Sequence, residues 1–189
     1  MKLGALVLRG TIGSLFVGHG TQKLFGWFDG PGLDGVSGMM EKLELRPPRR
    51  HALLAGLSET VGGALLAAGA LTPVATAMLT GTMTTAIRKV HAPKGVWVTS
   101  GGYEYNAVMI AAVAALADHG PGALSVDSKA FPRMHGAAWA AAAVAAGVAG
   151  SYLAERPPFN EPAPEPERAG SETRTGRFER VEQPVETTT

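Results

Sequence analysis

Hydrophobic and polar positions along this chain fall into long apolar blocks. Between positions 52 and 87, a stretch of 36 residues, Glu59 is the one charged residue. A helix on the surface of a soluble protein would need polar residues on its wet side at every third or fourth position. Runs of about 20 apolar residues match a hydrocarbon core of roughly 30 Å at about 1.5 Å per helical residue. The pattern therefore predicts a helical membrane protein.

The apolar blocks predict five helices, at about residues 3–25, 51–71, 73–90, 103–118 and 135–153. The second and third are joined at Thr72 and Pro73, too short a link for a real loop, so they form a tight hairpin. The fourth is short, and the fifth is almost entirely alanine and glycine, which suits close packing. The predicted fold class is all-α, a polytopic transmembrane helix bundle.

Lysine and arginine in the predicted loops set the orientation. Seven fall on one side and three on the other; the first set is Lys42, Arg46, Arg49, Arg50, Arg88, Lys89 and Lys94, and the second is Lys2, Lys129 and Arg133. Loops rich in lysine and arginine remain on the cytoplasmic side of a membrane. We expect a multi-pass protein of the plasma membrane with its N-terminus outside and its C-terminal tail in the cytoplasm.

Composition divides the chain into three parts. Residues 155–189 carry five Arg and eight Glu with many prolines and few large apolar side chains, so they are expected to be a disordered cytoplasmic tail. Residues 1–130 form the predicted four-helix membrane domain, and residues 131–154 hold the fifth helix. The chain has no cysteine, which excludes disulfides and thiol redox chemistry by this chain alone.

Ionisable side chains inside the predicted spans are the candidate site, because such groups are costly in a bilayer. Depth counted from the cytoplasmic ends places His19, Glu59 and Arg88 in one layer, with Arg9 roughly 15 Å further out along its helix. The candidate polar site is His19, Lys23, Glu59, Arg88, His91, Tyr103, Glu104 and Asn106. Lys23 and Arg88 also fit plain interfacial roles, but a carboxyl in the middle of an apolar helix needs a partner.

The same residues resemble a known family. The similar positions are Arg9, Gly13, Phe16, His19, Gly20, Lys23, Gly26, Glu59, Gly62, Gly63, Gly69, His91, the run 101–106 (GGYEYN), Gly120, Pro121, Gly122, Ser125 and Asp127. In order and spacing they resemble the DoxX family of small bacterial membrane proteins. The resemblance implies a four-helix membrane core, to which the fifth helix and the tail are additions. It also implies a link to quinone-coupled sulfur oxidation and to soluble redox enzymes.

Three functions remain open on these grounds. The first is a membrane scaffold of a redox, oxidative-stress or sulfur-metabolism complex. The second is a quinone-binding subunit of an oxidoreductase that uses the layer around His19 and Glu59, with electrons supplied by a partner because no cofactor is encoded. The third is a small proton-linked transporter. Catalytic residues are not assigned, no metal site is predicted, and the expected partners are the bilayer, soluble redox enzymes and a second copy of the chain, not nucleic acid.

Overall fold

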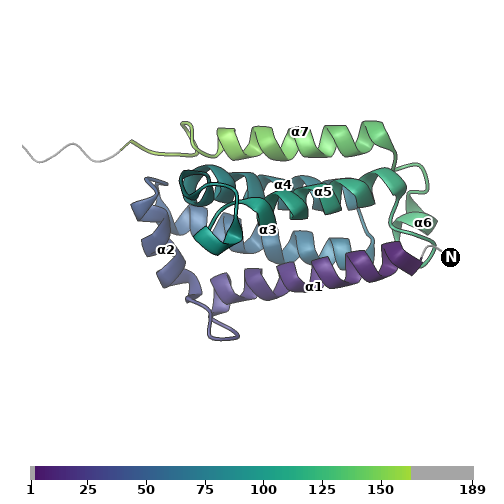
Figure 1. Ribbon diagram of the computed structural model, residues 1–189, viewed down its shortest axis with the longest axis horizontal. Helices are drawn as coiled ribbons and strands as arrows, with labels where there is room; N and C mark the ends of the chain where they lie inside the picture. Colours follow the sequence, from purple (N-terminus) through teal and green to yellow (C-terminus); the bar gives the residue numbers. More distant parts are fainter. Residues whose placement is uncertain (1–2, 163–189) are drawn as a thin grey trace, which may run out of the picture.

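A computed structural model describes residues 3–162, and this part of the chain is helical, with no strand (Figure 1). The helices are α1 (Leu3–Phe25), α2 (Gly32–Lys42), α3 (Pro48–Ala68), α4 (Thr72–Ala86), α5 (Glu104–His119), α6 (Asp127–Ala130) and α7 (Ala137–Leu153). A π-helical turn, η1 (Ile87–His91), prolongs α4, and two 3₁₀ turns follow, η2 (Ala92–Lys94) and η3 (Val98–Ser100). The all-α prediction is confirmed, and the five expected helices all form.

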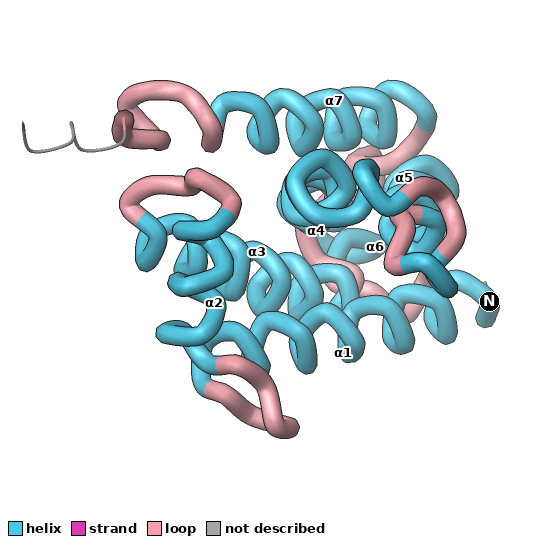
Figure 2. The backbone as a smooth tube through the Cα atoms, turned by 60° about the vertical axis from the view of Figure 1, so that its left-hand side comes forward, coloured by secondary structure: helices cyan, strands magenta, loops and turns pink. Residues whose placement is uncertain are grey.

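The five long helices run alongside one another, and α2 lies across one end of them (Figures 1 and 2). We call this the α2 end; it also holds η1–η3 and the last turn of α7. The opposite α6 end holds the start of α1, the α3–α4 turn and α6. The helix α2 was not predicted from the sequence; it lies within the expected loop between the first two predicted spans. Its apolar positions Leu33, Val36 and Met40 pack together with Leu45 and Ala52.

Close contact between α1 and α3 depends on glycine. A Cβ atom on Gly13 would lie 2.6 Å from the carbonyl oxygen of Gly63, and one on Gly20 would lie 2.7 Å from that of Gly56. No real Cβ tolerates such distances, so the two backbones approach as far as they do because these residues have no side chain. The facing pairs also fix the antiparallel register of the two helices.

The predicted hairpin between α3 and α4 is present. Gly69 ends α3 in the left-handed conformation, with φ of 62°, and Leu71 adopts φ of 46° before α4 begins at Thr72. Pro73 then occupies the first turn of α4, where its missing N–H costs no helical hydrogen bond.

Large apolar side chains lie on the surface of the helices as well as in the apolar core. Large apolar side chains are exposed on the outward faces of the helices, including Val7 (58%), Leu57 (48%) and Val108 (59%). Thr72, Thr76 and Thr80, at every fourth position of α4, are buried between helices. By length and composition alone, one helix among the described residues, Pro48–Ala68, could cross a membrane, and Ala137–Leu153 is a shorter apolar helix. The five-span bundle is therefore not confirmed by this criterion.

The beginning of the predicted tail is folded against the α2 end. Asn160 accepts a hydrogen bond from the backbone N–H of Arg46 at 2.6 Å, and Arg50 donates to the carbonyl oxygens of Pro158 and Phe159. The expectation of disorder from residue 155 onward does not hold for residues 155–162, because these backbone contacts hold them in place. The rest of the expected tail, residues 163–189, lies outside the described residues.

Candidate functional site

Lys23 and Glu59 form an ion pair between α1 and α3. The Lys23 Nζ donates to Glu59 Oε2, and the side chains are 22% and 3% exposed. An isolated carboxylate at this depth would be strongly disfavoured, so the ammonium group is what lets Glu59 occupy the interior. The expectation that Glu59 has a specific partner is confirmed.

The partner is Lys23, and not His19 or Arg88 as the depth count suggested. In the register fixed by the glycine contacts, Glu59 is level with position 17 of α1, so Lys23 lies six residues, between one and two turns, nearer the α2 end. A helical side chain leans toward the N-terminus of its own helix. Lys23 therefore reaches inward and Glu59 outward, and the two groups meet.

His19 lies on the outer surface of α1. Its ring Nδ1 is 3.1 Å from Oε1 of Gln22, and the residue is exposed. His19 is thus about one helical turn from Lys23 but faces away from the bundle interior. Depth alone could not predict this, because it gives no information on rotation about the helix axis.

Arg88 belongs to a separate network that fastens α7 to α4. Its guanidinium binds Glu155 through two hydrogen bonds, of 2.8 and 3.2 Å, and lies 3.6 Å from the centre of the Tyr152 ring. Lys89 pairs with the same carboxylate at 3.1 Å, and Ser151 accepts from Arg88 at 3.1 Å. Such bidentate, charge-assisted bonds are strong and geometrically specific. The turn η1 carries Arg88 and Lys89 to this position.

Three of the remaining four candidate residues hold the loop between η1 and α5, and the fourth, Asn106, lies in the core. The His91 ring bonds the carbonyl oxygen of Gly101 at 2.7 Å, and the Glu104 carboxylate accepts from the Val98 N–H at 2.7 Å. The Tyr103 N–H donates to the Gly95 carbonyl at 3.2 Å. Asn106 donates to the sulfur of Met83 at 3.3 Å within the core. The eight candidates therefore do not form one layer: Lys23 pairs with Glu59, Arg88 joins the α7 network, three residues hold the loop, and His19 and Asn106 stand apart from these groups.

A second polar cluster lies at the α6 end. It was not predicted from the sequence. Arg9, only 3% exposed, donates to the carbonyl oxygens of Ala67 and Leu124 and so ties α1 to the end of α3 and to the α5–α6 loop. Asp127, 2% exposed, accepts from the Leu71 and Thr72 N–H groups at 2.7 and 2.8 Å. Its carboxylate thereby caps the start of α4.

The signal for this cluster was already in the sequence. Gly69 meets Ser125, Pro121 and Arg9, since a Cβ there would lie 2.5 to 3.1 Å from these side chains. All four positions were among those that carried the family resemblance. The partners of Arg9 could not be predicted from its place along α1, because one is in α3 and the other is in the α5–α6 loop, far along the chain.

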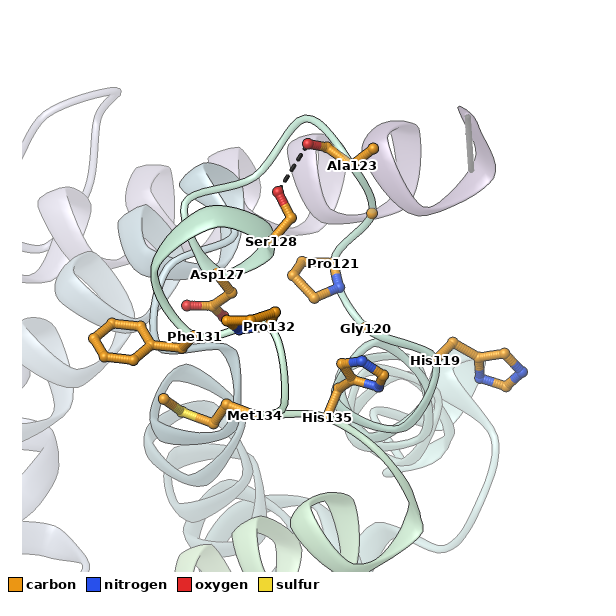
Figure 3. Close-up of a pocket in the computed structure, with 11 residues that line it drawn as sticks. His119, Gly120, Pro121, Ala123, Asp127, Ser128, Phe131, Pro132, Met134 and His135 are labelled. Atoms are coloured by element: carbon orange, nitrogen blue, oxygen red, sulfur yellow. Dashed lines mark hydrogen bonds between the residues drawn. The ribbon is translucent and has the colours of Figure 1, made fainter.

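A cavity of about 340 Å³ opens beside this cluster (Figure 3). It is lined by the loop from His119 to Ala123, by Asp127 and Ser128, and by residues 131, 132, 134 and 135. The His135 ring faces Gly120, whereas the His119 ring points away. Ser128 donates to the Ala123 carbonyl at 2.8 Å across the rim. Among the described residues, no three His, Cys, Asp or Glu side chains are grouped as metal ligands.

Comparison with protein-family models matches the first half of this chain. Residues 4–92 match the sequence model of the DoxX family, from the first turn of α1 through η1. The resemblance noted in the sequence continued to Asp127, whereas this match ends before α5. Neither the curated proteins nor the solved structures include a significant match.

Proposed function

We propose that this chain is a membrane scaffold in a redox, oxidative-stress or sulfur-metabolism complex. The match of residues 4–92 to the DoxX family supports a DoxX-like membrane protein. In this proposal α1, α3, α4, α5 and α7 cross the plasma membrane. The α2 end faces the cytoplasm and the N-terminus lies outside. The apolar outward faces of the helices and the excess of lysine and arginine at the α2 end support this arrangement.

The observation that carries the scaffold role is the internal pairing of the buried charges. Lys23 binds Glu59, Arg88 binds Glu155, and Arg9 binds two carbonyl oxygens. Each of these charged groups has a partner within the chain, as expected of contacts that hold a bundle together, although the Nε of Arg9 has no hydrogen-bond partner. The exposed charges that remain available to a partner include Asp34 and Arg49 at the α2 end, with side chains 96% and 65% exposed.

Purification of the full chain in mild detergent tests this role. We expect a soluble redox enzyme to co-purify in fixed stoichiometry. The double variant Asp34→Arg/Arg49→Glu exchanges the two charges and should release the enzyme. The ion pair between the two positions is kept, but the charges that a partner contacts are reversed. Lys129→Glu at the α6 end is the matched control and should keep the partner. No stoichiometric partner with the native chain, or equal loss in both variants, would contradict the scaffold.

One observation favours a quinone site as a second candidate. His19 is exposed on the outer surface of α1, about one turn from the Lys23–Glu59 pair, so a ring moving in the acyl-chain region could reach it. With Nδ1 donating to Gln22, the imidazole in its protonated form would donate from Nε2 to one quinone carbonyl, and the ion pair lies nearby as a proton source. Organic extracts of the purified protein would then contain quinone. His19→Ala should lower the amount retained, and Ser14→Ala, also exposed on α1, should not.

A further inference from the structure

Three aromatic side chains are exposed together where α1 passes into α2. Phe25, Trp27 and Phe28 are 62%, 57% and 71% exposed, and the Phe25 and Trp27 rings lie 5.3 Å apart. None of them packs against the core. We refer to these three residues as the aromatic foot.

The backbone that carries the foot is held tightly. Gln22 donates from its side chain to the Phe28 carbonyl at 3.3 Å, and the Gly30 N–H donates to the Trp27 carbonyl at 3.1 Å. A Cβ on Gly30 would lie 2.5 Å from Cβ of Gln22, so the loop folds back closely onto α1. Phe28 itself has φ of 54°, a conformation that non-glycine residues rarely adopt. The rings are thus displayed by a fixed loop.

The direction of the loop indicates whether its side chains contact lipid or a soluble partner. In both backbone views the loop between α1 and α2 projects sideways, past the outward face of α1, rather than along the axis of the bundle (Figures 1 and 2). The outward face of α1 continues into it through exposed Leu15 and Phe25. A soluble partner at the α2 end would approach along the axis, whereas lipid surrounds the bundle on its sides.

We propose that the aromatic foot inserts into the phospholipid leaflet at the α2 end, at the boundary between headgroups and acyl chains. Tryptophan and other aromatic rings favour this zone. The exposed carboxylate of Asp29, next along the loop, keeps the insertion shallow. The foot then sets the depth of α1 and holds α2 in the plane of the membrane surface. This inference rests on the proposed insertion of the bundle.

Fluorescence quenching in vesicles tests the foot directly. The chain has three tryptophans, so Trp97→Phe/Trp139→Phe leaves Trp27 alone. After reconstitution into phosphatidylcholine vesicles, bromine on the acyl chains should quench Trp27, most strongly at the positions nearest the headgroups. The proposal would be overturned if Trp27 fluorescence were not quenched by brominated lipid but were quenched by aqueous iodide.

A second single-tryptophan protein separates failure of the foot from failure of insertion. Trp27→Phe/Trp97→Phe leaves Trp139, which is 46% exposed near the start of α7. Quenching of Trp139 without quenching of Trp27 would reject the foot and leave the spanning bundle standing. Absence of quenching in both proteins would reject both.

Discussion

Lys23, two residues before the end of α1, donates to Glu59, in the middle of α3, and this pair joins the two helices at the point where their glycines bring them into contact. The pair is asymmetric. The lysine side chain is 22% exposed and the glutamate 3%. A lysine without its partner can extend toward the interface, whereas the carboxylate has no such route. The two single substitutions are therefore not equivalent.

We expect Lys23→Leu to destabilise the protein more than Glu59→Leu does. Breaking a buried pair from one side costs about 3–5 kcal/mol, and we expect about 2–4 kcal/mol for Lys23→Leu because the site is partly open. The double variant should lose less than the sum of the single losses. Thermal unfolding of the purified proteins in detergent measures all three. A larger loss of stability for Glu59→Leu, or losses that add in the double variant, would show that the ion pair does not stabilise the contact between α1 and α3.

Helix positions could be predicted well from the sequence, because apolar blocks and their breaks are local properties. Burial of Glu59 could also be predicted, since its helix has no polar side on which a carboxylate could be solvated. The helix α2 was missed because glycines and charges interrupt its apolar positions. Its spacing Leu33, Val36, Met40 was nevertheless a helical signal.

The partners of the charged groups could not be predicted from depth. Depth orders residues along a helix but gives neither the rotation of the helix nor its neighbours. Arg88 lies near the level assigned to it, yet it faces α7 and binds Glu155. Glu155 lies 67 positions further along the chain, just after α7, at the first residue of the expected tail.

Asp127 should be required for the α3–α4 turn. It accepts from two backbone N–H groups and from the Thr72 hydroxyl at 2.6 Å. Loss of a capping side chain costs about 1–2 kcal/mol, and we expect Asp127→Ala to lower stability by at least this amount. Asp127→Asn, which keeps one acceptor oxygen, should lose less. Exposed Lys129→Ala serves as the control, and melts in which it matches Asp127→Ala would contradict the capping role.

Packing of α7 on α4 should depend on Gly147. A Cβ there would lie 2.5 Å from the Ala77 carbonyl oxygen, whereas a Cβ on Gly150 would meet nothing within 4 Å. We expect Gly147→Leu to push α7 away and Gly150→Leu to leave it in place. The readout is a disulfide in a Thr85→Cys/Ser151→Cys background, at side chains whose oxygens are 2.9 Å apart. The chain has no other cysteine, so the cross-link is unambiguous.

In that experiment the cross-link should form in the background protein and in Gly150→Leu, and fall sharply in Gly147→Leu. Equal yields in both leucine variants would mean that α7 does not depend on this close approach. In that case the Arg88–Glu155 network alone holds the helix.

Five spans predict a definite pattern of labelling in intact cells. Single cysteines at Gly38 in α2 and at Gly170 in the tail should resist an impermeant thiol reagent, because both lie in the cytoplasm in the proposed arrangement. Gly38 is suitable because a side chain there meets nothing within 4 Å, unlike Gly35, where Cβ of Pro31 would be 2.9 Å away. A cysteine at exposed Ala123, in the α5–α6 loop, should be labelled from outside. Labelling at 170 but not at 38 would show that α7 does not cross the membrane, and labelling at 38 but not at 123 would invert the orientation.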